Sequence, residues 1–269
     1  MRINIHHETT YHYDAHPTHL VQRLHLTPSD FTTQKTISWK ISAPGIENAL
    51  SYVDGFGNRV HLVTADVVDR NYRIIAEGEI ETMDSSGVVR GLANNLPDQI
   101  YLRQTETTEL DSAMSAALEM FPTNGDALEH AHKLMQFVHG KIAYEVGTSV
   151  AETTAAQAFA AGRGVCQDHA HVLVGLARAQ KTPARYVTGY LITGIGASSA
   201  AAHAWAELLI PDLGWVGFDA ANGQCPTEHY VRLAAGLDAS AVAPVKGSRR
   251  GAFGTEQLTV AVRAEIAQQ

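Results

Sequence analysis

The sequence is poor in cysteine, with only Cys166 and Cys225 among its 269 residues. Two cysteines are too few for a disulfide framework, and their spacing lacks the paired pattern of a zinc ribbon. Charged residues are also scarce, at 18% of the chain, where an average soluble protein has roughly 25%. Together with 45% hydrophobic residues, this composition predicts a compact chain without a long disordered tail.

The chain also has fewer basic than acidic residues, with 20 Lys and Arg and 28 Asp and Glu, which gives a net charge of −8. This balance disfavours binding to phosphate backbones or anionic lipids, so we expect neither nucleic acid nor a membrane as partner. No run approaches the ~18 apolar residues that span a bilayer. The first residues also lack the apolar stretch of a secretory signal, and we therefore expect a cytoplasmic protein.

The first hundred residues carry the pattern of β-strands. Residues 2–13 alternate, with Ile3, Ile5, Tyr11 and Tyr13 on one face and polar side chains on the other, as in a half-buried strand. Turn-forming clusters separate further short apolar runs, at residues 20–26, 37–41, 50–53, 60–63 and 72–80. This spacing predicts an N-terminal antiparallel β-sandwich over residues 1–100.

From about residue 110 the apolar period changes to three and four, which is typical of helices. Thr154 and Gln157 have the spacing of a capping box, and a second helix is expected to begin near Cys166. Strand patterns return in the last third, at residues 185–191, 203–210, 215–219, 230–233 and 258–262. We predict an α+β chain of two domains, with a catalytic α+β domain over residues 101–269.

Cys166 is a candidate nucleophile because it follows the residues Gly-Arg-Gly-Val and stands at the expected start of a helix. Free backbone N–H groups and the positive end of the helix dipole favour a thiolate there. The same N–H groups are placed to stabilise the oxyanion that forms when a thiolate attacks a carbonyl. The alternative is an inert buried cysteine.

His203 and Asp219 stand at the two ends of an expected hairpin. A symmetric two-residue turn would place their side chains on opposite faces. A five-residue loop over residues 210–214 instead puts Asp219 opposite Trp205 and diagonal to His203 on one face. In that register the carboxylate can orient the imidazole, while the other ring nitrogen takes the thiol proton. For either residue alone, a structural role is the simpler interpretation.

Histidines suggest two rival metal sites. A zinc site from Cys166, His169, His171 and His203 is disfavoured, because the side chain of His171 points away from its neighbours on a helix. A second group lies in the N-terminal strands, where alternation separates neighbouring side chains; it comprises His6, His7, His12, His16, His19 and His25. We expect polar surface there and no metal.

Four strings resemble the core of the bacterial transglutaminase-like superfamily: GVCQDHAH at 164–171, ARYVTGY at 184–190, AHAWAE at 202–207 and GWVGFD at 214–219. HETTY at 7–11 and DGFGN at 54–58 are similar to the β domain that precedes this core in many bacterial members. The resemblance implies a papain-like α+β cysteine enzyme. By position it makes Cys166 the nucleophile, His203 the general base and acid, and Asp219 the residue that orients His203.

The chain departs from the family pattern after the aspartate, where residues 220–222 read Ala-Ala-Asn in place of Pro-Thr-Asn. A papain-type oxyanion glutamine is also missing, because Ala160 stands six residues before the cysteine. Tyr144, in a Tyr-x-x-x-Thr stretch that recurs in the superfamily, is our candidate for the second oxyanion donor. Trp205 is a further candidate for oxyanion or substrate binding.

These residues together predict acyl transfer from a peptide or amide bond through a thioester. We expect a peptidase or amide hydrolase with a peptide or protein substrate and no cofactor. A transglutaminase or peptide ligase, in which an amine resolves the thioester, is the alternative. A second alternative is a peptide-binding protein without catalytic activity. The sequence does not indicate the oligomeric state.

Overall fold

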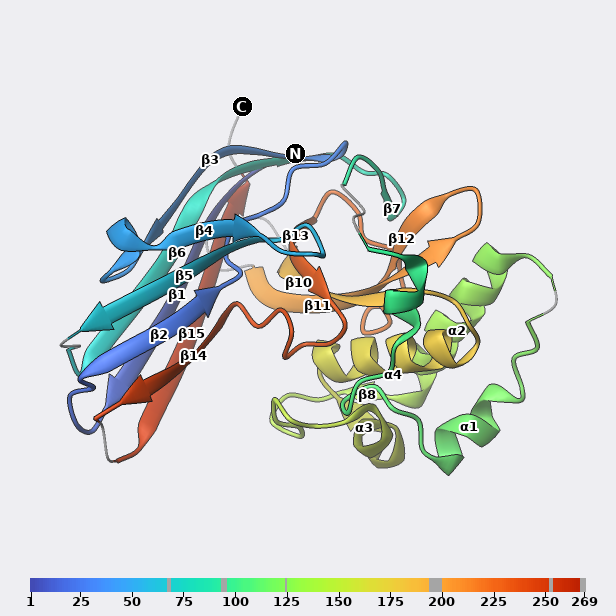
Figure 1. Cartoon of the computed structure of the whole chain (residues 1–269). Coiled ribbons are helices and arrows are strands. Elements are labelled where there is room, and N and C mark those ends of the chain that lie inside the picture. Colours follow the sequence, from blue (N-terminus) through green and yellow to red (C-terminus); the bar gives the residue numbers. More distant parts are fainter. Residues whose placement is uncertain (67–68, 93–95, 124, 194–199, 252–253, 267–269) are drawn as a thin grey trace.

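The computed structural model describes residues 1–66, 69–92, 96–123, 125–193, 200–251 and 254–266. A sandwich of two antiparallel sheets lies beside a mixed α/β core (Figure 1). The predicted α+β class is therefore confirmed. Within these described ranges, no helix combines the length and the apolar character needed to cross a membrane.

The sandwich consists of two four-stranded sheets. The first has the order β15 (Glu256–Ile266), β1 (Arg2–Tyr13), β6 (Asn71–Thr82), β3 (Gln34–Ser42). The second has the order β14 (Val245–Arg250), β2 (His19–Leu24), β5 (Arg59–Asp66), β4 (Leu50–Val53). The alternation expected in residues 2–13 is present, because Ile3, Ile5, Tyr11 and Tyr13 are all buried.

The last two strands of the chain belong to these sheets and not to the core. β14 pairs with β2, and β15 pairs with β1 along its whole length, from Ile3↔Ile266 to Tyr13↔Glu256. A division of the chain at residue 100 does not capture this pairing, because strand partners far apart in sequence leave no local signal. The chain must consequently run from the core back to the sandwich, and this connection borders the site described below.

The core is built on a five-stranded sheet with the order β13 (Tyr230–Gly236), β10 (Ala184–Ile192), β11 (Ala200–Ile210), β12 (Gly214–Phe218), β7 (Val88–Val89). Its helices are α1 (Ser112–Leu118), α2 (Ala127–Lys141), α3 (Ala155–Ala161) and α4 (Cys166–Ala179), with short strands β8 (Ala143–Tyr144) and β9 (Arg163–Gly164) and the 3-10 turn Asp98–Leu102. A further 3-10 turn, Ile46–Asn48, packs against β5 of the sandwich. Helix α4 packs on β10 and β11, and α2 and α3 pack on α4. The predicted capping box of α3 forms between Thr154 and Gln157.

Two side-chain amides join the sandwich to the outer strand β13 of the core sheet. Gln34 exchanges two hydrogen bonds with the backbone of Arg232, at 2.7 and 2.8 Å. Asn58, from the DGFGN turn, makes the equivalent pair with Ala235, at 2.8 and 2.9 Å. Each amide acts like one residue of a neighbouring strand. It therefore provides hydrogen-bond partners for backbone N–H and C=O groups of β13 that would otherwise be buried without partners.

A buried ion cluster ties the three strands nearest this interface together. Glu207 of β11 accepts from Nε of Arg185 in β10 at 2.6 Å and from Nε of Arg232 in β13 at 2.9 Å. All three side chains are at most 3% exposed. Loss of any partner would leave a buried charge unpaired. The cluster therefore fixes the strand that also carries His203.

Candidate active site

Cys166 is the first residue of α4 and is partly buried. The carboxylate of Asp168 folds back over the helix start, where its Oδ2 accepts from the backbone N–H of Val165 at 2.7 Å and from Ser149 Oγ at 2.6 Å. A Cβ atom on Gly164 would lie 2.6–2.9 Å from this carboxyl group. Glycine at 164 thus leaves the room that Asp168 needs to hold the turn before Cys166.

The hairpin of β11 and β12 has the register that the five-residue loop predicts, with Ile210 opposite Gly214 and Ala206 opposite Phe218. Positive φ angles at Asp212 and Gly214 close the loop. His203 and Asp219 consequently meet, with 2.7 Å between Nε2 and Oδ2. The two side chains thus meet on one face, as the five-residue loop predicts, and their roles in catalysis stay a prediction.

Asp219 is fully buried and is surrounded by donors. Its Oδ1 accepts from the backbone N–H groups of Ala221 and Asn222 at 3.0 and 3.2 Å. Its Oδ2 accepts from Asn222 Nδ2 and from the Tyr230 hydroxyl, both at 2.7 Å. The Ala-Ala-Asn turn therefore supports the carboxylate. Burial raises the pKa of Asp219, but the hydrogen bond and charge of His203, followed by the hydrogen bonds from Asn222 and Tyr230, outweigh burial and keep this pKa below its usual value.

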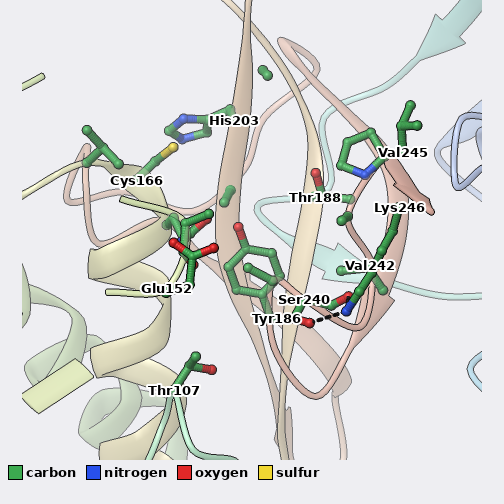
Figure 2. A pocket seen from close by; sticks show the side chains of 18 of the residues that line it. Thr107, Glu152, Cys166, Tyr186, Thr188, His203, Ser240, Val242, Val245 and Lys246 are labelled. Atoms are coloured by element: carbon green, nitrogen blue, oxygen red, sulfur yellow. Dashed lines mark hydrogen bonds between the residues drawn. The ribbon is translucent and has the colours of Figure 1, made fainter. Parts of the chain in front are cut away.

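Cys166 and His203 lie side by side, with the sulfur next to the imidazole ring (Figure 2). Because Nε2 of His203 is bound to Asp219, Nδ1 is the nitrogen left for the thiol. Burial lowers the pKa of His203, but hydrogen bonds and charge from Asp219 and Cys166 outweigh burial and raise it from 6.5 to about 9. The imidazolium form is thus the stable one at neutral pH.

The other two predicted site residues lie outside the cleft. Tyr144 is 55% exposed on β8, which runs parallel to the segment before the nucleophile. Partial burial, followed by the charges of Cys166 and Asp219, raises the pKa of Tyr144, so its hydroxyl lies within electrostatic range of the reacting groups. Trp205 is 3% exposed and packs edge-on against Tyr230 at 5.6 Å. The tryptophan therefore supports the wall behind His203 and does not reach the cleft.

The histidines near the nucleophile have structural partners. His169 uses both ring nitrogens on backbone carbonyl groups, of Val165 and of Ile142, at 2.9 Å each. Nε2 of His171 accepts from the backbone N–H of Ala239 at 3.1 Å. Among the N-terminal histidines, His7 bonds the hydroxyl of Tyr190 inside the protein. These contacts give the rings of His169, His171 and His7 roles in packing.

Cys166 and His203 open into a cleft of about 750 Å³. The start of α4 forms one wall, and residues 239–246, which connect β13 to β14, form the opposite wall. Tyr186 and Thr188 of β10 lie between them (Figure 2). Sequence reasoning missed this opposite wall and Tyr230, because only the sheet pairing brings these segments to the site. It also missed the role of Asn222, although the Ala-Ala-Asn turn after Asp219 was a local signal for it.

Comparison with known families agrees with this geometry. Residues 115–220, which contain Cys166, His203 and Asp219, match the transglutaminase-like superfamily. Residues 3–81 match the bacterial transglutaminase-like N-terminal region. The chain thus has a transglutaminase-like core preceded by a bacterial transglutaminase-like N-terminal region. The transglutaminase-like core accounts for the α4 start and the hairpin, and the N-terminal region accounts for most of the sandwich.

Relatives of this transglutaminase-like chain include the uncharacterized protein ML0607 of Mycobacterium leprae, 26% identical over 93% of this chain and 95% of its own. The uncharacterized protein Rv2569c of Mycobacterium tuberculosis is 24% identical, and the match covers 91% of this chain and 87% of that protein. A crystal structure of a putative cysteine protease from Cytophaga hutchinsonii superposes with a TM-score of 0.78 at 21% identity. The superposition covers 100% of this chain and 91% of the Cytophaga hutchinsonii protein. The likeness shows a shared two-part fold.

Proposed function

We propose that this transglutaminase-like protein is a cysteine peptidase or amide hydrolase. The observation that carries the proposal is the arrangement of Cys166, at the start of α4, beside a histidine whose far nitrogen is held by buried Asp219. Such a histidine activates the thiol and then serves as the acid for the leaving amine. An open cleft beside the sulfur gives a peptide access to it.

In the first half of the reaction the Cys166 thiolate attacks the amide carbonyl, and the bond to the leaving amine breaks after the His203 imidazolium donates its proton. The carbonyl oxygen becomes negative in between. The Cys166 backbone N–H, which has no partner within the helix, is one donor to this oxyanion. Tyr144 does not line the cleft, but its hydroxyl lies within range of the Cys166 charge and is our candidate for the second donor once a substrate is bound.

In the second half a water molecule attacks the thioester, and His203 takes the proton of this water. The carboxylic acid leaves, and the Cys166 thiolate is regenerated. Hydrolysis is the default outcome, because water outnumbers any amine unless the protein binds the amine in a dedicated pocket. Transfer to an amine uses the same thioester and is distinguished by its product.

The proposal is tested by incubating the protein with a peptide library that includes glutamine-containing and D-amino-acid-containing members, with and without a labelled amine at millimolar concentration. We expect free acids with ammonia or peptide fragments as the main products, identified by mass, and no products with Cys166→Ala. Dominant amine incorporation would identify a transferase. Complete absence of covalent turnover would support a peptide-binding role and overturn the proposal.

A further inference from the structure

The far wall of the cleft carries a lysine whose position is fixed by the sandwich. Lys246 lies in β14, where it pairs with Arg23 of β2, and it lines the same cleft as Cys166 and His203. Figure 2 shows its side chain on the wall opposite Cys166. The N-terminal domain therefore contributes to the cleft through the strand that it pairs with.

The ammonium group of Lys246 is held in place by Ser240, but not all of its hydrogen-bond donors have a partner. Its Nζ donates to Ser240 Oγ at 2.5 Å and lies 3.3 Å from the carbonyl oxygen of Ser240 (Figure 2). An ammonium group has three protons to donate. At least one N–H is thus free for a ligand, while the serine restricts where the group can point.

The opposite side of the cleft carries the other sign of charge. Glu106 and Glu152 both line it, and Glu152 lies below Cys166 in Figure 2. Within the described part of the chain, neither glutamate nor Lys246 forms an ion pair with another residue. A single cleft is thus lined by one exposed cation and two exposed anions, and Glu152 lies on the side opposite Lys246 (Figure 2).

The surface between these charges is polar and roomy. Tyr186 and Thr188 bring hydroxyl groups to it, and the small side chains of Ala202, Ala204 and Ala239 leave space above the sheet. Glu106, Glu152 and Lys246 are all exposed in the open cleft, so a purely apolar ligand would gain nothing from these charges. A peptide with charges of both signs would satisfy them.

We propose that the substrate is a peptide whose carboxylate is bound by Lys246 and whose ammonium group faces Glu106 and Glu152. This inference rests on the proposed function, because it assigns the substrate of the same site. Charge-assisted hydrogen bonds of this kind set specificity as well as affinity. Lys246 is accordingly a specificity residue and takes no part in the chemical step.

The test uses the peptides that the library screen finds to be cleaved. Each Asp or Glu near the cleaved bond is replaced by its amide, and kcat/KM is measured for the matched pair. Because Lys246 is exposed, we expect the acidic peptide to be favoured about 2- to 5-fold. Lys246→Met should reduce this ratio to near one, Lys246→Glu should favour a lysine in place of the acidic residue, and acetylation of the peptide amine should slow cleavage.

Lys40→Met is the matched control, because Lys40 is an exposed lysine of β3 outside the cleft; the acidic preference should persist in it. Ser240→Ala, which frees Lys246 from its tether, should weaken the preference without reversing it. Cleavage with no difference between acidic and amide peptides would overturn this inference alone. Absence of any cleavage would overturn the proposed function and the inference with it.

Discussion

The hydroxyl of Tyr230 donates a 2.7 Å hydrogen bond to Oδ2 of Asp219, the same oxygen that binds Nε2 of His203. The two residues come from different strands, because Tyr230 begins β13 and Asp219 follows β12. The tyrosine ring also lies edge-on to His203, at 5.9 Å. The start of β13 therefore closes the buried side of the catalytic group.

Tyr230→Phe should consequently destabilise the fold and weaken catalysis, because Asp219 loses a donor that water cannot replace in a buried site. We expect a loss of about 1–2 kcal/mol in the free energy of unfolding, measured with denaturant, together with a several-fold drop in kcat/KM. Tyr52→Phe, at a 46% exposed tyrosine of β4, is the control. Equal effects of the two substitutions would show that the Tyr230 hydroxyl has no special role.

Asp219→Asn should move the pH dependence of the reaction. The pKa of His203 is about 9 in the folded protein, so the imidazolium form stabilises the fold fully below pH 6.5, and this stabilisation is lost as pH rises through 9. Removing the Asp219 charge lowers the pKa of His203, and the alkaline limb of kcat/KM should shift to lower pH. If the alkaline limb of kcat/KM stays at the same pH, a group other than His203 determines that limb.

The same aspartate should be the mildest member of the triad to remove. By analogy with hydrolases whose triads have been dissected, we expect Asp219→Ala to lower kcat on the order of 10⁴-fold, and Cys166→Ala or His203→Ala on the order of 10⁶-fold. Steady-state kinetics on one cleaved peptide give the ranking. Wild-type turnover by Cys166→Ala would exclude the mechanism.

The register of β11 and β12 could be predicted from sequence, because a hairpin is local and its loop length determines which side chains share a face. The position of Cys166 could be predicted for a similar reason, since helix starts have local signals. Both predictions depended on residues close together in the chain.

Tyr230, the pairing of β14 and β15 with the sandwich, and the role of Asn58 could not be predicted in this way. Each depends on contacts between segments far apart in sequence: Asn58 meets Ala235, and Lys246 reaches the cleft only because β14 pairs with β2. The family motif DGFGN was visible in the sequence. Its function, which is to bind the edge of the catalytic sheet, was not.

Gly164→Ala should disturb the nucleophile, since the new Cβ would lie within 2.9 Å of the Asp168 carboxyl group. We expect a lower Tm and slower alkylation of Cys166 by iodoacetamide, because the turn that precedes the helix must shift. Gly140→Ala is a suitable control: Gly140 is in helix α2 with nothing within 4 Å of its added Cβ. That substitution should stabilise the protein by roughly 0.5–1 kcal/mol. Alkylation at the wild-type rate in Gly164→Ala would contradict the proposed role of Asp168.

The two cysteines should differ in reactivity. Burial raises the pKa of Cys225 to about 11, so almost none of it is thiolate at neutral pH. Cys166 has the His203 imidazolium beside it and a helix start behind it. Competitive alkylation near pH 6, followed by peptide mass spectrometry, should modify Cys166 first, and equal rates would count against its role as nucleophile.

The central claim is that Cys166 takes the acyl group from an amide, and the most direct measurement is the mass of the protein during turnover. The protein is mixed with a cleaved peptide, quenched in acid within the first turnover and weighed intact, and the adduct is located by peptide mapping. We predict an added mass equal to the acyl part of the peptide, held as a thioester on Cys166, absent in Cys166→Ala and removed by hydroxylamine. Peptide cleavage without any such adduct, or an adduct at another residue, would contradict the account.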